Sequence, residues 1–173
     1  MSRLSALTIT TLSLLFLGVG LTAGAAVGQQ KTLKEQVVGT WTYASITAER
    51  KDGSKFDPWV PNGKGLLIFT NNGRFSVQLM RSDRPKLASN DRLVGTPEEN
   101  KAMAEGVLSY FGTYSVNNAD KTVTVHIEAS SFPNWEGTDQ VRSVTITGDE
   151  LKYTAPVSST GGASGAQAIW KRS

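Results

Sequence analysis

The residues best suited to proton transfer are one histidine and a nearby carboxylate. His126 is the only histidine of the 173 residues, and Glu128 follows two positions later. On a strand, side chains two positions apart leave the same face about 7 Å apart, so the carboxylate could raise the pKa of the imidazole and the pair could move a proton. The alternative is that both point outward, because the surrounding alternate positions are apolar, namely Val123, Val125, Ile127 and Ala129. The sequence alone leaves both possibilities open.

A second group of candidates is rich in arginine. Charged side chains crowd the segment 81–92, namely Arg81, Asp83, Arg84, Lys86, Asp91 and Arg92. A guanidinium group binds carboxylates and phosphates through a planar fork of donors, so Arg81 and Arg84 are candidates for holding an anionic head group of a ligand. The alternative is that Asp83 and Asp91 pair with these arginines inside the segment, and the two arrangements can coexist.

Aromatic side chains supply the apolar surface that a small-molecule site requires. Tyr43 lies two residues after Trp41, on the same face of an expected strand, and Trp135 lies in a Pro-Asn-Trp loop that could close over the rim of a cavity. Together with Tyr114, Tyr43 and Trp135 are candidates for contacting a ligand. The alternative is that they pack in the core, as aromatic residues of small β proteins usually do.

The composition excludes several kinds of chemistry. The sequence has no cysteine and one histidine, which excludes disulfides, thiolate zinc sites, cysteine nucleophiles and metal centres built from several histidines. We therefore expect no metal and no cofactor. The net charge of +3 is not gathered into a basic stripe with interleaved aromatic residues, so we expect no nucleic-acid partner either.

The N-terminal residues have the pattern of an export signal. Arg3 precedes a mostly apolar stretch at residues 12–21, which is short for a membrane span and is followed by small residues. We expect a signal peptide over residues 1–28, a mature domain over residues 29–173, a periplasmic or secreted location, and no stable membrane anchor after cleavage. The alternative is an uncleaved membrane anchor.

The mature chain has the period-2 alternation of an all-β protein. Short runs rich in valine, isoleucine, threonine and aromatic residues are separated by glycine, asparagine and aspartate, as in the turn Asn71-Asn72-Gly73. The expected strands are residues 38–49, 65–70, 74–81, 112–116, 122–129, 138–147, 150–154 and 167–172.

One segment departs from this alternation. Thr96-Pro97-Glu98-Glu99 combines a capping threonine, a proline suited to the first helical position and a glutamate three residues after the cap. This pattern predicts a helix over about residues 97–108, with Met103 and Val107 at helical spacing. We expect it to cover one end or edge of the sheet; the alternative is a functional lid.

Eight antiparallel strands can either close into a barrel or stack as a sandwich. Closure removes the exposed edges that a soluble β protein must otherwise protect, so we expect the barrel and keep the sandwich as the alternative. An eight-stranded barrel has room inside for its own side chains or for one small ligand.

Motifs spread along the mature chain indicate a family. Gly39-Thr40-Trp41 stands on the first expected strand and Trp170-Lys171-Arg172 on the last. Further characteristic runs are residues 65–69, 73–78, 81–85, 90–92, 95–99, 110–114, 126–128 and 131–135. Over about residues 33–172 the sequence resembles the lipocalin-like domain family of bacteria and fungi, whose members are largely uncharacterised. This resemblance implies a calycin-type barrel with a helix inserted between strands.

The resemblance also implies structural roles for three residues. In the wider family the tryptophan of a G-x-W motif packs at one end of the barrel beneath a basic side chain from a late strand. Trp41, preceded by Gly39, is that tryptophan here, and Arg172 is its candidate partner, with Lys171 as the alternate. The resemblance implies neither a ligand nor a catalytic residue.

These observations lead to three functional hypotheses. The leading one is an exported lipocalin-like protein that binds a small, mostly hydrophobic molecule in the barrel, with an anionic group near Arg81 or Arg84. The second is a cofactor-free isomerase or cyclase in which His126, Glu128 or a tyrosine moves a proton. The third is a filled barrel that acts through its surface loops.

Overall fold

The computed structural model describes residues 31–156, 159 and 163–173, and the signal peptide expected over residues 1–28 lies outside this described part. The described residues form strands β1 (Gly39–Arg50), β2 (Lys55–Phe56), β3 (Lys64–Phe69), β4 (Arg74–Met80), β5 (Val107–Asn117), β6 (Thr122–Ser130), β7 (Asp139–Thr147), β8 (Glu150–Ala155) and β9 (Ala163–Arg172). The helical segments are α1 (Leu33–Val37), α2 (Pro97–Glu105) and a 3-10 turn at Pro133–Trp135. None of the described helices is long and apolar enough to span a membrane.

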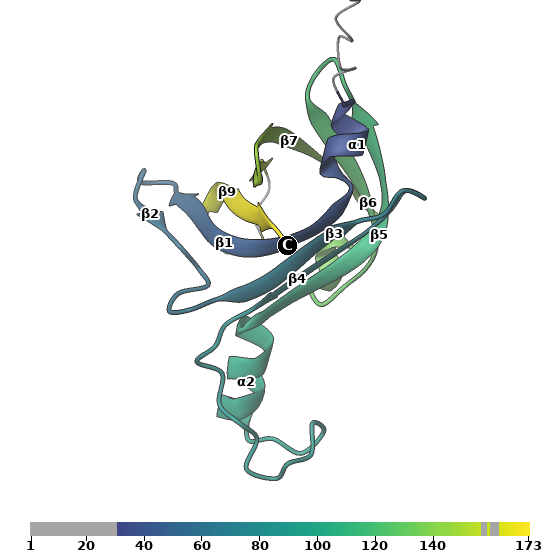
Figure 1. The fold of residues 1–173 in the computed structure, drawn as a ribbon. Coiled ribbons are helices and arrows are strands. Elements are labelled where there is room, and N and C mark those ends of the chain that lie inside the picture. Colours follow the sequence, from purple (N-terminus) through teal and green to yellow (C-terminus); the bar gives the residue numbers. More distant parts are fainter. Residues whose placement is uncertain (1–30, 157–158, 160–162) are drawn as a thin grey trace, which may run out of the picture. The chain divides into compact units, whose positions relative to one another are not determined.

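Eight of the described strands close into an antiparallel barrel, which confirms the expected fold and excludes the sandwich. The strand order is β1-β3-β4-β5-β6-β7-β8-β9, and β9 pairs back with β1. Trp41 lies opposite Arg172 and Ala48 opposite Ala166 along this closing pair. The two-residue β2 pairs with the end of β1 and was not predicted from the sequence. Figure 1 shows the strands surrounding the interior.

The inserted helix begins as expected but ends earlier. The Thr96 hydroxyl accepts a hydrogen bond from the Glu99 amide, and the Glu99 carboxylate accepts one from the Thr96 amide, so the predicted capping box is present. The helix ends at Glu105, not near residue 108, because β5 starts at Val107 and pairs with β4. The prediction that this strand starts at residue 112 was therefore wrong as well.

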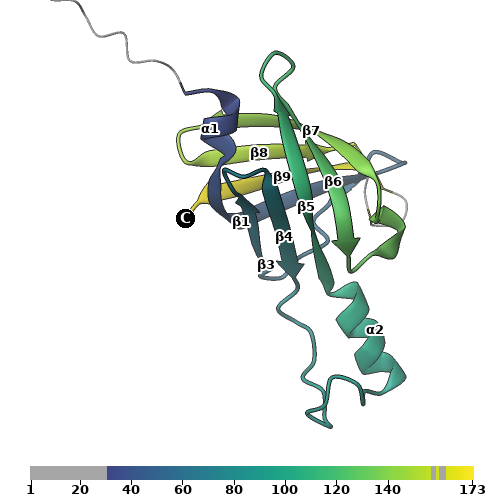
Figure 2. The same cartoon turned by 90° about the vertical axis from the view of Figure 1, so that its right-hand side faces the viewer.

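One end of the barrel is closed by the unpredicted helix α1, which lies at the opposite end from α2 (Figure 2). Leu33 and Val37 of α1 are buried, and the indole Nε1 of Trp41 donates a 2.8 Å hydrogen bond to the Val37 carbonyl. The guanidinium Cζ of Arg172 lies 4.1 Å from the centroid of the Trp41 ring. Arg172 also donates hydrogen bonds to the carbonyls of Gln36 in α1 and of Val38 directly after it, so the cation on the indole ring fastens the helix over this end of the barrel.

Gly39 allows this arrangement because of its backbone conformation. Its φ of +136° lies outside the range that L side chains favour, and a Cβ built there would lie 3.1 Å from Nη1 of Arg172. The first position of the G-x-W motif therefore leaves space for the arginine that covers the tryptophan.

Candidate functional site

The barrel interior contains a cavity of about 70 Å³ toward the end away from α1. It lies among the first residues of β5, whereas α1 contacts the end of that strand, where the Leu33 amide donates to Asn118. Most of its lining is apolar or aromatic, and the lining residues are Ile46, Trp59, Val77, Leu79, Leu108, Tyr110, Trp135, Arg142, Tyr153, Ala155, Ser159, Ala168 and Trp170.

A larger cleft adjoins this cavity at the mouth of the barrel, since the two share lining residues. Its volume is about 690 Å³, and Trp59, Leu108 and Ser159 line both the cleft and the cavity. Phe132 and Arg81 also line the cleft. A ligand-sized cleft that continues into an aromatic cavity has the form of a small-molecule site.

Trp59 is held at the mouth by a carboxylate in the loop between β2 and β3. The two oxygens of Asp57 accept hydrogen bonds from the Tyr43 hydroxyl at 2.7 Å, the Ile46 amide at 3.0 Å and the Trp59 amide at 2.8 Å. These bonds attach the loop to β1. As a result, the Trp59 side chain is buried between the cavity and the cleft rather than exposed on a free loop.

Trp135 forms a second aromatic wall of the cavity. It ends the 3-10 turn after β6, and its ring meets Tyr110 edge-on, with the ring centroids 5.3 Å apart. The ring of Phe132 also meets the Trp135 ring edge-on, with the centroids 5.8 Å apart. Three rings in edge-to-face contact fix one another's orientation, so this wall is preformed.

Arg142 on β7 is the most unusual residue of the cavity, because a charged side chain is only 1% exposed there. Its Nη2 donates to the Gln140 side-chain oxygen, and its Cζ lies 6.0 Å from the centroid of the Trp135 ring. Within the described residues, Nε and Nη1 have no hydrogen-bond acceptor. Burying a cation without a counter-ion costs several kcal/mol, so this guanidinium requires an explanation.

Two further polar groups of the cavity are also without a partner among the described residues. They are the Tyr153 hydroxyl and the Trp170 indole Nε1. Burial raises the pKa of Tyr153 and of Tyr110 above the ordinary value, while the nearby Arg142 guanidinium acts in the opposite direction. Both phenols therefore remain neutral and cannot serve as the counter-ion of Arg142.

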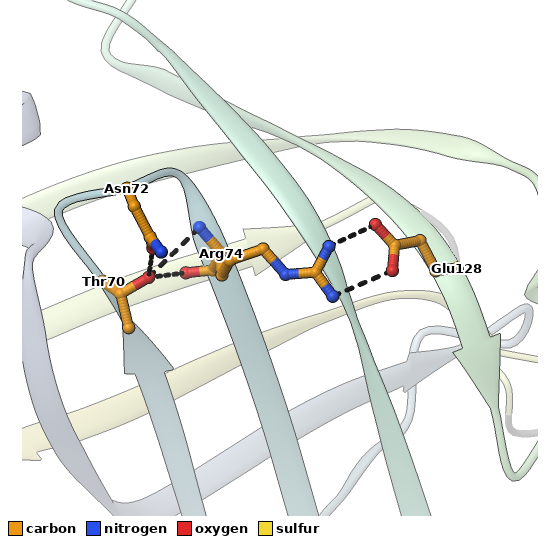
Figure 3. A network of polar contacts seen from close by, with 4 residues as sticks. All are labelled: Thr70, Asn72, Arg74 and Glu128. Carbon is orange, nitrogen blue, oxygen red and sulfur yellow. Dashed lines mark hydrogen bonds and ion pairs between the residues drawn. The ribbon is translucent and has the colours of Figure 1, made fainter.

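The two candidates for proton transfer lie on the outer wall. His126 Nδ1 is 2.7 Å from an oxygen of Asp139, and the histidine side chain is 48% exposed. Glu128 accepts hydrogen bonds from both terminal nitrogens of Arg74, at 2.5 and 2.9 Å (Figure 3). Neither residue lines the cavity, so the isomerase or cyclase hypothesis has no imidazole at the cavity.

The two candidate arginines for an anionic group differ in position. Arg81 lines the cleft, but its Nε and Nη2 donate to the carboxylate of Asp83 at 2.9 and 2.6 Å. The Arg81 guanidinium in turn lowers the pKa of Asp83. Arg84 donates from Nε to the Arg81 carbonyl and lines a different surface depression, next to Met103. At the rim, the charge of Arg81 is thus already neutralised.

The structure brings only one of the three candidate aromatic residues to the cavity, and this is Trp135. Tyr43 donates its hydroxyl to Asp57 and acts on the site only through the loop that carries Trp59. Tyr114 packs against Phe69, with ring centroids 4.8 Å apart, and donates to the Thr70 carbonyl.

No set of three histidine or acidic side chains that could hold a metal ion is found in the part of the chain that the structure describes. The residues that the sequence reasoning missed are Trp59, Arg142, Tyr153 and Trp170.

Comparison with known proteins gives a family and one named relative. The model of the lipocalin-like domain matches residues 38–173. The 4'-hydroxy-3'-methoxypropiophenone carrier protein ppsC of Aspergillus oryzae is 36% identical over 85 residues, which are 46% of this chain and 77% of the relative.

Solved structures of similar proteins share little sequence with this chain. A lipocalin-like protein from Bacteroides uniformis is 14% identical, with a TM-score of 0.43, covering 79% of this chain and 98% of its own. An uncharacterized protein from Bacteroides eggerthii is 12% identical, with a TM-score of 0.41, covering 79% of this chain and 99% of its own.

Proposed function

The chain belongs to the lipocalin-like domain family, and on this premise we propose that it binds one small, mostly hydrophobic molecule at the mouth of its barrel. The observation that carries the proposal is the aromatic cavity of about 70 Å³ that continues into a cleft of about 690 Å³. Pockets of a few hundred Å³ with apolar walls and few polar groups are typical of small-molecule sites. A filled barrel acting through surface loops would not need this continuity.

The name of the relative supports a ligand with an aromatic ring. That protein is named a carrier of an aromatic ketone. In the present chain, the indole of Trp59 lines both the cleft and the cavity, so a flat ring in the cleft would meet it, and the indole of Trp135 lines the cavity below. Aromatic rings favour offset or edge-on contact with such side chains, which adds to the gain from burying apolar surface.

A fluorescence titration tests this proposal. The probe is 4'-hydroxy-3'-methoxypropiophenone, added to the purified protein while tryptophan emission is recorded, with native mass spectrometry to count bound molecules. We expect saturable quenching and one bound molecule per chain, because tryptophans line the cavity. An unchanged emission spectrum and an unliganded mass, with this ketone and with other aromatic probes, would overturn the proposal.

A matched pair of variants locates the binding. Ala155 lines the cavity, so Ala155→Leu should fill part of it and weaken binding at least tenfold. Ala44 is exposed on β1, so Ala44→Leu adds the same atoms outside the barrel and should leave binding unchanged. Circular dichroism checks that both variants fold. Equal binding by the two variants would place the ligand elsewhere.

We also propose that the protein is exported. The support is the sequence pattern of residues 1–28, in which an apolar stretch after Arg3 is followed by small residues. Expression in a bacterial host followed by cell fractionation and N-terminal sequencing tests this. We expect a chain outside the cytoplasm that begins after Ala25 or Gly28, and full-length protein in the membrane fraction would contradict it.

A further inference from the structure

We propose that the ligand carries an anionic oxygen group, such as a carboxylate, and that the guanidinium of Arg142 binds this group at the bottom of the cavity. This inference rests on the proposed binding function and adds the chemical class of the ligand. The notable observation is that the cavity combines a buried positive charge with several hydrogen-bond donors that have no acceptor.

The unpaired donors come from three neighbouring strands. Arg142 lies on β7, Tyr153 on β8 and Trp170 on β9, and all three side chains line the same cavity. Within the described residues, Arg142 Nε and Nη1, which carry three N–H groups, have no acceptor, and neither the Tyr153 hydroxyl nor the Trp170 indole has a partner. A carboxylate accepts hydrogen bonds only, with two oxygens, so it complements a pocket of donors.

The charge of Arg142 is not balanced by the carboxylates near the site. In the described part of the chain, no ion pair includes Arg142. The two carboxylates that line the cleft have other partners: Asp57 accepts from Tyr43 and two backbone amides, and Glu105 pairs with Lys101. A ligand with a negative charge would supply the missing counter-ion in a place from which water is largely excluded.

The sizes of the two spaces fit a molecule bound with its anionic end inward. A cavity of about 70 Å³ holds a group the size of a carboxylate, since a water molecule occupies roughly 30 Å³ in the liquid. The apolar body would then lie in the larger cleft between Trp59, Leu108 and Phe132. Arg81 at the rim is a weaker anchor because Asp83 already occupies its guanidinium.

Two probes of nearly the same size and shape, one an anion with two acceptor oxygens and one neutral, test the inference. Isothermal titration calorimetry at pH 7 compares 2-naphthoate with the neutral 2-naphthamide on the wild-type protein. We expect naphthoate to bind at least tenfold more tightly. Equal affinities, or no binding of naphthoate, would overturn the inference without any variant. If the amide and the aromatic ketone still bind, the proposed binding function survives, whereas loss of all binding overturns both.

Variants then locate the anionic group. Arg142→Met should lower naphthoate affinity to that of the amide, and Arg142→Lys should restore part of the difference because it restores the charge. Arg81→Met removes a guanidinium at the rim and should keep the preference for naphthoate. Loss of the preference in Arg81→Met but not in Arg142→Met would assign the group to the rim and contradict the proposal.

Discussion

Replacing Arg142 by methionine should make the ligand-free protein more stable while removing its preference for an anion. Methionine is close to arginine in length and volume but carries no charge and no buried donors. In most buried positions, deleting a polar side chain leaves a partner unsatisfied and destabilises the fold. Here two of the three guanidinium nitrogens of the wild-type side chain, Nε and Nη1, have no acceptor among the described residues.

The expected magnitude follows from the contacts of the guanidinium. The substitution loses one charged hydrogen bond to Gln140, about 1.5–3 kcal/mol, and a contact with the Trp135 ring at the limit of cation–π distance, about 0.5 kcal/mol. It removes the desolvation penalty of an unpaired ion. Buried ionic groups replaced by apolar ones of similar volume typically leave stability unchanged or raise it by about 1–4 kcal/mol. We expect a gain of about 1–3 kcal/mol in the free energy of unfolding.

The assay is urea unfolding followed by tryptophan fluorescence, on protein freed of ligand by unfolding and refolding. Arg74→Met is the control, because Arg74 is 44% exposed and paired with Glu128, and exposed pairs contribute at most about 1 kcal/mol. Adding 2-naphthoate at about 100 times the wild-type dissociation constant should stabilise wild type by about 2.7 kcal/mol, and Arg142→Met, which binds at least tenfold more weakly, by about 1.4 kcal/mol or less. A ligand-free Arg142→Met protein destabilised by more than about 1 kcal/mol would refute the reasoning, since the guanidinium would then be paired in the folded chain.

Three other measurements follow from the fold. Gly112→Ala should destabilise by about 2 kcal/mol or more in urea unfolding, because the added Cβ would lie 1.9 Å from the His126 carbonyl at the β5 bulge; an unchanged midpoint would contradict that geometry. Thr96→Ala should raise amide exchange within α2 while leaving global unfolding nearly unchanged, because this helix has no buried residue; a large global loss would contradict it. Absorbance at 295 nm should show no phenolate near pH 10 until the protein unfolds. Burial raises the pKa of every tyrosine above 10, so the contribution of the tyrosines to stability is fully present below pH 10 and falls as the pH rises above it. A phenolate signal from folded protein would contradict burial of Tyr43, Tyr110, Tyr114 or Tyr153.

The barrel could be predicted from the sequence because its strands follow local rules. Period-2 alternation and asparagine-glycine turns locate the strands to within a few residues, apart from β5 and β9, which start earlier than expected. The early start of β5 has a tertiary cause. The spacing of Met103, Val107 and Tyr110 suits a helix, but pairing of Val107 with Met80 and of Tyr110 with Val77 places these residues in the barrel wall.

The candidate site was predicted less well because ligand contacts depend on which strand ends reach the mouth. Trp135 lines the cavity, whereas Tyr114, chosen for the same aromatic character, packs at the closed end. Trp59 could not be found by periodicity, because it lies in a loop placed by the carboxylate of Asp57 rather than on a strand. Residue type selected aromatic side chains as candidates, and tertiary contacts decided which of them line the cavity.

For Arg142, the sequence does contain a usable signal. Val144 on β7 is buried and so marks the inward face of the strand. Because side chains alternate between the two faces, Arg142 and Gln140 also point inward and Val141 points outward. An apolar residue that is 50% exposed beside an arginine that is 1% exposed reverses the usual pattern of a barrel wall. Stability alone would favour the opposite arrangement, because a buried unpaired cation opposes folding. A reversal of polarity at two inward positions of an otherwise regular strand therefore supports the proposed binding role. The Arg142→Met measurement tests whether stability is lowered there in exchange for recognition of an anion.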